Sequence, residues 1–437
     1  MALYDIGLFD MHLLKGKFTG GAGVNMASLF DSLTNEYKVL YLPRSEILYD
    51  RSEDERVSLL DRVKIIEKNG TRVSKTFKRI ISDPLNYHTL SYKNLRAFLL
   101  SGYIKESGDA RILYDNDFTS IWYPYPLYGG DIFEISSKSS VKKIGITLRG
   151  TNTVTLENHL KIIKLIFHNE GINLNPGFIR RYIELLITPY HMNYQMRFMK
   201  KNPKLKFIGV INKLHIGIFT DVQPSREDIQ FYHLFPADEI IIPLDFYQIK
   251  ASDRVFYYAR LVPEKGIFEI PFIALNLKQM GLKIKLRVAG QFSLESDKRT
   301  FFNLIRKLGV DDVVEYLGFL RVEDLKRELG SSKVLVYPSH SDVTSTVILQ
   351  TLSQGTVVVA YDIPMLRSMY ESINPVIFTN EYDTEEMAKK TAYFLTHDRE
   401  RESLFDTYSK DFIGLHSSRT NVFKSIKEML DCELTLL

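Results

Sequence analysis

Cysteine is almost absent from this sequence. Only Cys432 occurs among 437 residues, so no disulfide can form within the chain. A small secreted protein stabilised by disulfides is therefore excluded, and a cytoplasmic location is predicted. Cys432 itself is expected to be a small buried apolar residue.

Long hydrophobic runs and a strong excess of one charge are also missing. No apolar run approaches the ~18–20 residues that a membrane-spanning helix needs, and residues 1–14 lack the basic and apolar regions of a signal peptide. The sequence therefore predicts a soluble chain, or one that only rests on a membrane surface. The net charge of +4 is too small to indicate nucleic-acid binding.

Motifs for metals and for P-loop nucleotide binding are absent as well. The ten histidines are scattered and no pair has metal-ligand spacing. There is no G-x-x-x-x-G-K-[ST] motif. Asp115 and Asp117 are two residues apart, but capping or solvated carboxylates are the commoner outcome for such a pair. We therefore predict no metal and no cofactor.

Strand-like and helix-like segments alternate along the whole chain, which favours an α/β class with parallel sheets. The length and the hydrophobic content of 45% favour two domains. We predict domains at 1–245 and 246–415, and a helix at 416–437 that packs back towards the first domain. The predicted strands are 3–10, 37–42, 110–115, 142–150, 254–261, 283–290, 313–319, 333–338 and 356–361.

The glycine-rich segment "TGGAGV", residues 19–24, follows the first predicted strand. Gly21 and Gly23 let the backbone approach a ligand, and the helix start that follows favours an anion. Met26 stands where the third glycine of a dinucleotide fingerprint belongs, so that motif is incomplete. A ligand-binding loop and a tight turn without a ligand remain equal alternatives.

Two more segments follow strands in the second half. In "YARLVPEKGI", residues 258–267, Arg260 and Lys265 place two cations at the carboxyl end of a strand, which suits a diphosphate. Surface charges on a loop are the alternative. The segment "DVTSTVILQ", residues 342–350, is predicted to open a helix although it is rich in β-branched residues. Asp342 or a following hydroxyl is expected to cap this helix.

Four motifs then occur in order: "ARLVPEKG", "YLGFL" at 316–320, "YPS" at 337–339 and "QGTVVVA" at 354–360. Together they resemble the C-terminal domain of the GT-B retaining glycosyltransferases of the "glycosyl transferases group 1" type. The resemblance implies two Rossmann-like parallel-sheet domains that face each other across a cleft. It covers roughly residues 250–400, and "GGAG" matches the family's first glycine loop.

The resemblance also implies roles for individual residues. Arg260 and Lys265 would neutralise the diphosphate of a nucleotide-sugar without a metal, Asp342 would lie near the donor sugar, and Arg149 would add charge near the leaving group or acceptor. Gln350 occupies the position that normally binds the ribose hydroxyls. The remaining implied donor-binding residues are Gly21, Gly23, Gly318, Phe319, Leu320, Thr344, Ser345 and Thr346.

The predicted function is transfer of a hexose from a nucleotide-sugar to a glycan or lipid-linked acceptor, with retention of configuration. Asp342 and Gln350 replace the family's two glutamates, and Val343 and Ser345 replace its small glycines. These departures keep two alternatives open. One is a catalytically impaired GT-B chain that binds a sugar, a nucleotide or a partner subunit, and the other is a nucleotide-sugar epimerase.

The segment "RFMKKNPKLK", residues 197–206, is basic and contains no acid. It is either a solvated helix end and loop, or a patch for anionic lipid or a phosphorylated acceptor. The second alternative predicts a peripheral contact with the inner face of a membrane. Its cations are Arg197, Lys200, Lys201, Lys204 and Lys206.

Overall fold

A computed structural model describes residues 254–435 without a gap and shorter segments before them. These are residues 4–10, 33, 36–37, 39–43, 118–123, 141–148, 160, 163–164, 166–167, 182, 186, 200–220, 226–235, 245 and 250. The chain divides into two compact units. Unit 1 comprises Met1–Leu156, Ile183–Glu239 and Val422–Leu437, and unit 2 comprises Glu157–Tyr182 and Ile240–Asn421.

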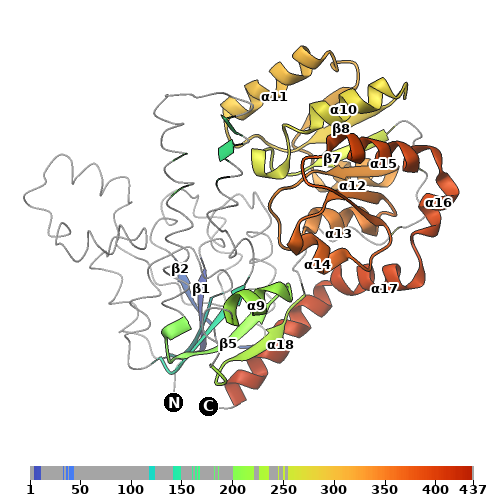
Figure 1. Ribbon diagram of the computed structural model, residues 1–437. Helices are drawn as coiled ribbons and strands as arrows, with labels where there is room; N and C mark the ends of the chain where they lie inside the picture. Colours follow the sequence, from blue (N-terminus) through green and yellow to red (C-terminus); the bar gives the residue numbers. More distant parts are fainter. Residues whose placement is uncertain are drawn as a thin grey trace, which may run out of the picture. The chain divides into compact units, whose positions relative to one another are not determined.

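Unit 2 is built on a six-stranded sheet whose neighbouring strands all pair in parallel (Figure 1). Short runs of valine, leucine and tyrosine form these strands, and β10 and β11 are buried throughout, as expected for a parallel sheet covered on both faces. The strands are β7 (Arg254–Tyr258), β8 (Lys285–Ala289), β9 (Val314–Gly318), β10 (Val334–Tyr337), β11 (Val357–Tyr361) and β12 (Val376–Thr379).

Helices follow the strands of unit 2 and pack in two groups. Helix α10 packs on α11 and α15, while α13 packs on α12 and α17. Right-handed crossovers in a sheet of this order put such groups on opposite faces. The helices are α10 (Ile270–Gln279), α11 (Glu295–Leu308), α12 (Val322–Ser331), α13 (Thr346–Ser353), α14 (Pro364–Tyr370), α15 (Thr384–Thr396), α16 (Asp398–Ser403) and α17 (Thr407–His416).

The strand order decides where a ligand is expected in unit 2. Across the sheet the order is β12-β11-β10-β7-β8-β9, the arrangement of a Rossmann domain. The direction in which the strand order progresses reverses between β7 and β10, which are hydrogen-bonded neighbours. Ligands of open parallel sheets bind at the carboxyl ends of the strands at such a switch point. The loops after β7 and β10 are the segments that carry Lys265 and Asp342.

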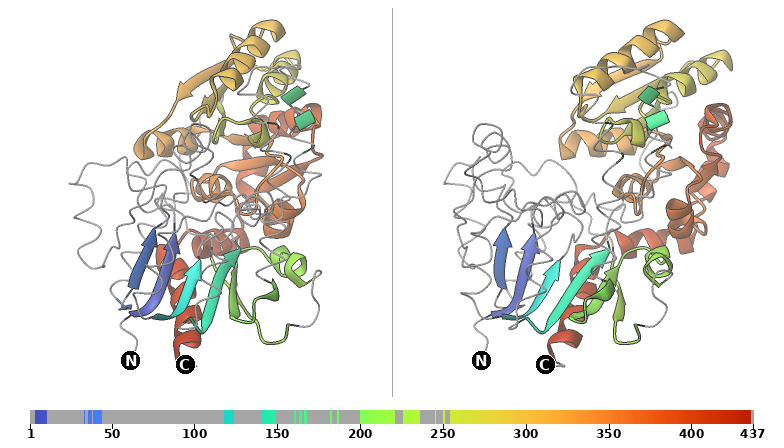
Figure 2. Two further views of the ribbon diagram at one scale, coloured as in Figure 1. Left: turned by 90° about the vertical axis from the view of Figure 1, so that its left-hand side faces the viewer. Right: turned by 60° about the vertical axis from the view of Figure 1, so that its left-hand side comes forward.

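Unit 1 contains a second parallel sheet, with the order β2-β1-β3-β4-β5-β6 (Figure 2). The strands predicted at 3–10, 37–42 and 142–150 are confirmed, whereas the one predicted at 110–115 lies outside the described residues. Strands β3, β5 and β6 were not predicted. The strands are β1 (Tyr4–Asp10), β2 (Val39–Pro43), β3 (Phe118–Tyr123), β4 (Lys143–Leu148), β5 (Leu205–Val210) and β6 (Gln230–His233), and α9 (Leu214–Thr220) follows β5.

The last helix, α18 (Arg419–Thr435), ends within unit 1. Its Glu433 accepts hydrogen bonds from Lys143 of β4, at 2.7 Å to the carbonyl and 3.3 Å to Oε2, and from Tyr232 of β6 at 2.7 Å. Asp431 accepts one from Tyr37 at 2.6 Å. The helix thus uses its acids to attach to three separated parts of the unit. Cys432 is exposed, so the prediction that it is buried is wrong; it precedes Glu433, which faces the sheet.

A close backbone contact joins the loops after β7 and β10. Gly266 ends the short 3-10 helix η4 (Pro263–Lys265) with φ of 76°, in the left-handed region. A Cβ atom at this position would lie 2.0 Å from the carbonyl oxygen of Pro338. Only glycine therefore permits both the turn and the approach.

Gly266→Ala is expected to destabilise the protein more than Gly281→Ala. Both glycines have φ of 76°, so the left-handed backbone cost is shared, but nothing lies within 4 Å of a Cβ at Gly281. That shared cost is about 1–2 kcal/mol. Urea unfolding of both variants measures the difference, and equal losses of unfolding free energy would contradict the close contact.

Candidate functional site

Lys265 and Asp342 meet where the loops after β7 and β10 come together. Lys265 Nζ lies 2.9 Å from Asp342 Oδ2 and donates to the Ser341 carbonyl at 2.6 Å. The exposed fractions of the two side chains are 15% and 14%. The sequence motifs predicted both residues, and the fold brings them into one ion pair at the switch point.

Asp342 has a second partner in Tyr337, the last residue of β10. The Tyr337 hydroxyl donates to Asp342 Oδ2, and Asp342 Oδ1 accepts from the Val343 amide at 3.0 Å. Burial, together with the charge of Asp342, raises the pKa of Tyr337 well above its ordinary value, so the phenol keeps its proton. The Asp342 carboxylate is therefore held by a cation and two neutral donors.

Arg260 lies two residues after β7 and is exposed. In the part of the chain that the structure describes, its guanidinium makes no hydrogen bond or ion pair. A permanent cation of this kind can bind a phosphate without giving up an internal contact. Lys265, by contrast, must exchange or share its contact with Asp342 to bind an anion.

The helix predicted to start in 342–350 is α13, and Ser345 is its N-cap. Ser345 has an extended backbone, and its Oγ accepts from the Ile348 amide at 3.3 Å. Of the caps expected from the sequence, Asp342 is instead engaged with Lys265. Thr344 and Thr346 are half-buried on either side of the cap. The helix start lies close to the ion pair in sequence and favours an anion.

Gln350 lies inside unit 2, with an exposed fraction of 4%. Its Oε1 accepts a hydrogen bond from the hydroxyl of Tyr258, the last residue of β7. The Tyr258 hydroxyl also lies 3.4 Å from the Val347 carbonyl. The residue expected to bind ribose therefore has a structural partner at the end of a strand.

Gly318, Phe319 and Leu320 lie at the end of β9, which is separated from β7 by β8. Gly318 has φ of 73°, and a Cβ atom placed on it would meet nothing within 4 Å, so its backbone is accessible. Phe319 is 71% exposed, which is unusual for a large apolar side chain. An exposed ring beside an accessible glycine suits a flat, aromatic ligand group.

His340 was not singled out by the sequence, yet it lies in an enclosed network of charges. Its Nε2 lies 2.9 Å from Glu269 Oε1 and its Nδ1 lies 2.8 Å from Glu381 Oε1. Burial lowers its pKa, but the bonds to the two carboxylates outweigh burial and raise the pKa to about 9. His340 is therefore an imidazolium at neutral pH.

Tyr258, Tyr337 and His340 complete the region but were not predicted. Tyr337 and His340 stand inside the segment "YPSHSD", next to residues that the motif did identify. Proximity to the motif was the available signal for these two. No sequence signal connects His340 with Glu269 and Glu381, because these lie 71 and 41 positions away.

The glycines, Arg149 and the aspartates predicted in unit 1 fall outside the described part of the chain. Gly21, Gly23 and Arg149 belong to this group, as do Asp115 and Asp117. Within the described residues, no group of three histidine, cysteine, aspartate or glutamate side chains is arranged to hold a metal ion. None of the described helices is both long and apolar enough to cross a membrane.

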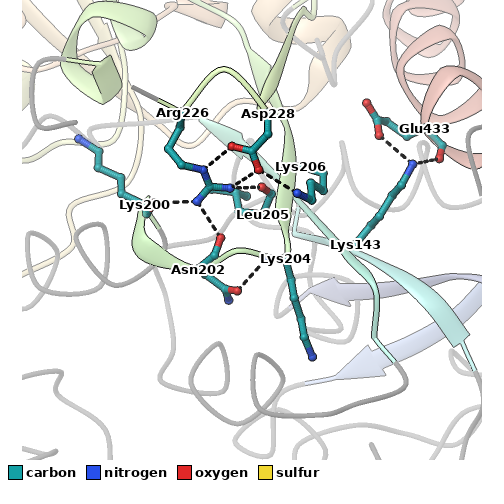
Figure 3. Close-up of polar contacts among 9 residues, drawn as sticks. All are labelled: Lys143, Lys200, Asn202, Lys204, Leu205, Lys206, Arg226, Asp228 and Glu433. Atoms are coloured by element: carbon teal, nitrogen blue, oxygen red, sulfur yellow. Dashed lines mark hydrogen bonds and ion pairs between the residues drawn. The ribbon is translucent and has the colours of Figure 1, made fainter. Parts of the chain in front are cut away.

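The basic segment 197–206 is described from Lys200 onwards, and part of its charge is used internally (Figure 3). Lys206 lies in β5, not in a loop, and its Nζ is 2.8 Å from Asp228 Oδ2. Arg226 also holds Asp228, with Nε 2.6 Å from Oδ1. Hydrogen bonds from Arg226 and Lys206 hold the pKa of Asp228 well below its usual range.

Arg226 fastens the turn before β5 through backbone carbonyls. Its guanidinium donates to the carbonyl oxygens of Lys200, Asn202 and Leu205 at 2.9–3.0 Å (Figure 3). The Lys204 side chain extends away from Asp228 in the same view, and burial lowers its pKa. The turn is therefore built by an arginine from elsewhere in the sequence.

The charge of His340 predicts a pH dependence of stability. Its pKa is raised above the ordinary value of 6.5 to about 9, so its contribution is complete below pH 6.5 and is lost as the pH rises through 9. The contribution is on the order of 3 kcal/mol. Unfolding free energies of the wild type and His340→Gln between pH 6 and 10 measure it.

The wild type must be compared with His340→Gln because Lys250 changes the pH dependence of stability in the opposite direction. Burial lowers the pKa of Lys250 to about 7, so its effect favours folding as the pH rises above 7. Lys250 is present in both proteins and cancels in the difference. A wild-type advantage that stays constant from pH 6 to 10 would contradict the charged state of His340.

Residues 247–411 match the family model described as "Glycosyl transferases group 1". An α-D-kanosaminyltransferase of Streptomyces kanamyceticus is 25% identical over 150 residues, which span 34% of this chain and 38% of that protein. The matched part thus covers well under half of that relative's length. The family match contains Arg260, Lys265, Asp342 and Gln350.

Solved structures of low sequence identity share the fold along nearly the whole chain. A sucrose-phosphate synthase of Thermosynechococcus elongatus has a TM-score of 0.67 at 11% identity, covering 99% of this chain and 100% of that one. A Rickettsia africae glycosyltransferase has 0.59 at 11%, covering 99% and 98%. Anabaena HepE in complex with UDP-glucose has 0.58 at 12%, covering 99% and 100%. The chain therefore has the GT-B fold, and its residues 247–411 match the glycosyl transferases group 1 family model.

Proposed function

We propose that this chain transfers a hexose from a nucleotide-diphosphate sugar to a glycan or lipid-linked acceptor, with retention of configuration. Arg260 and Lys265 bind the diphosphate, and no metal ion is required. Asp342 lies towards the sugar, and the exposed ring of Phe319 receives the base. Gly21, Gly23 and Arg149 keep the donor-binding and charge roles that the resemblance implies.

The Lys265–Asp342 ion pair at the switch point carries this proposal. The pair places a cation and an acid at the sheet edge where Rossmann domains bind ligands. The start of α13 follows Asp342 closely in sequence. The loops are joined by the close approach of Gly266 to Pro338, so the cation is held in place before a ligand arrives. Preorganised charge of this kind stabilises a leaving diphosphate.

The proposed route for the acceptor proton follows from the state of Asp342. Its carboxylate already accepts from Lys265 and Tyr337, so it is poorly suited to act as a base. In our proposal the acceptor oxygen bonds to the anomeric carbon as the bond to the diphosphate oxygen breaks. The acceptor proton passes to that departing diphosphate, on the same face of the sugar, and configuration is retained.

A catalytically impaired binding module is the second candidate, because Asp342 and Gln350 replace the glutamates of the resembled family. The family match and the presence of both cations favour a transferase. Incubation with UDP-, GDP- and ADP-hexoses, with and without lipid extract, separates the two. Acceptor-dependent release of nucleoside diphosphate supports transfer, whereas nucleotide binding without release would contradict it.

Lys265→Ala is expected to lower turnover of the active nucleotide-sugar by about 100-fold, because the transition-state charge loses its fixed cation. Arg260→Ala is expected to weaken nucleoside-diphosphate binding by about tenfold. The matched control is Arg399→Ala, which removes another exposed arginine of unit 2, in α16. Unchanged turnover and binding in both site variants would contradict the diphosphate role.

A peripheral membrane contact through 197–206 remains part of the proposal. Lys201 is an exposed cation of its described portion, whereas Lys206 is paired with Asp228. Lys201→Gln is expected to weaken sedimentation with phosphatidylglycerol vesicles by a few-fold, since a lysine near an anionic surface contributes about 1 kcal/mol. Equal sedimentation of both proteins, or equal binding to neutral phosphatidylcholine vesicles, would contradict the contact.

A further inference from the structure

His340 is a buried cation that the proposed transfer does not use. It stands two residues before Asp342, and its side chain is 2% exposed. Both of its ring nitrogens face carboxylates, those of Glu269 and Glu381. A carboxylate only accepts, so both nitrogens donate and the ring carries a positive charge.

The two carboxylates come from loops on either side of His340. Glu269 is the residue before α10, four positions after Lys265. Glu381 lies between β12 and α15. The His340 amide also donates to the Glu264 carbonyl at 3.0 Å. His340 therefore attaches to the loop after β7 on both sides of Lys265, and to a third loop through its other nitrogen.

Aromatic rings lie against the imidazolium. The Tyr382 ring stacks on His340 with centroids 4.6 Å apart, and the Tyr361 ring lies at 5.3 Å. Tyr382 has φ of 71°, and among the described residues it is the single non-glycine residue with positive φ. A strained conformation of this kind persists where the surroundings require it. Here it holds the ring against the cation.

The residues that make these contacts lie close to Lys265 and Asp342 in sequence. Lys265 lies between Glu264 and Glu269, and Asp342 follows His340 after one residue. Without the bonds from His340 to its two carboxylates, the loop after β7 would lose a contact with the loop after β10. The hydrogen bonds from Lys265 to Ser341 and Asp342 would then join the two loops without the additional contacts of His340.

We propose that His340 is a positioning residue that holds Lys265 in place relative to Asp342, so that both are set for the diphosphate of the donor. This inference rests on the proposed function for the identity of the ligand. The positioning itself concerns the loops and can be measured without a substrate. The titratable groups that face His340 are Glu269, Glu381, Tyr361 and Tyr382.

Amide hydrogen exchange of His340→Gln tests the positioning without any ligand. Glutamine is neutral and can reach one carboxylate at most, so exchange is expected to rise in 263–269, 338–342 and 380–383 by about tenfold. His397→Gln is the matched control, because His397 is exposed on the same unit. Unchanged exchange in these loops, or equal changes in the control, would overturn the inference.

A double-mutant comparison shows whether His340 acts through Lys265. Affinity for inorganic pyrophosphate and UDP is measured by calorimetry for His340→Gln, Lys265→Ala and the combined variant. His340→Gln alone is expected to bind these ligands about tenfold more weakly. The combined variant is expected to have the same affinity as Lys265→Ala, because the two effects are not additive. Additive losses would indicate a merely structural histidine and overturn the inference.

Two further arms keep the outcomes separate. If the wild type binds neither pyrophosphate nor UDP, GDP or ADP, the proposed function fails, while hydrogen exchange still decides whether His340 holds the loops. If His340→Gln does not fold, Glu381→Gln replaces it, because this variant keeps the bond to Glu269. Its exchange is expected to rise in 338–342 and 380–383, and no rise there would overturn the inference.

Discussion

The ion pair between Lys265 and Asp342 is the interaction on which the candidate site depends. Both side chains are largely buried, so neither charge is fully solvated and each requires the other. Removing one partner from a fully buried pair costs about 3–5 kcal/mol. A bound diphosphate can take the place of Asp342 as the partner of Lys265, while Asp342 keeps its hydrogen bond from the Tyr337 hydroxyl. The pair thus provides a preformed position for an anion.

The geometry of the pair comes from the topology of the sheet. Strands β7 and β10 are neighbours in space although β8 and β9 lie between them in sequence. Their loops leave the sheet at the same edge, where Gly266 passes against Pro338. His340 then joins these loops to a third loop. Charge, backbone approach and strand order therefore act together at one place.

The sequence predicted the strands β7 to β11 of unit 2 because short buried runs such as "KVLVYP" are distinctive. It did not predict β12, whose two middle residues are only partly buried, or β6, whose outer residues are exposed. Leu205 and Lys206, the first two residues of β5, were interpreted as part of a solvated helix end and loop because lysines dominate the composition of 197–206. A basic run of sequence does not by itself indicate a solvated loop, because an acid distant in sequence, here Asp228, can pair with one of its lysines.

The site was predictable only as far as its motifs extend. Arg260, Lys265 and Asp342 were identified because they stand in recognisable segments, and the fold brings Lys265 and Asp342 together. A hydroxyl after Asp342 was an expected helix cap, and Ser345 is that cap. The burial of Gln350, by contrast, depends on packing and on its hydrogen bond with Tyr258, which the sequence does not show. The network of His340 needs two partners that are distant in sequence, and no spacing rule connects them.

The most direct test of the site is a crystal structure of the protein with UDP bound. We predict diphosphate oxygens within about 3 Å of the Arg260 guanidinium and Lys265 Nζ, with Asp342 still bonded to Tyr337. A diphosphate bound elsewhere, with Lys265 unchanged on Asp342 and Arg260 without a ligand, would contradict the proposed site.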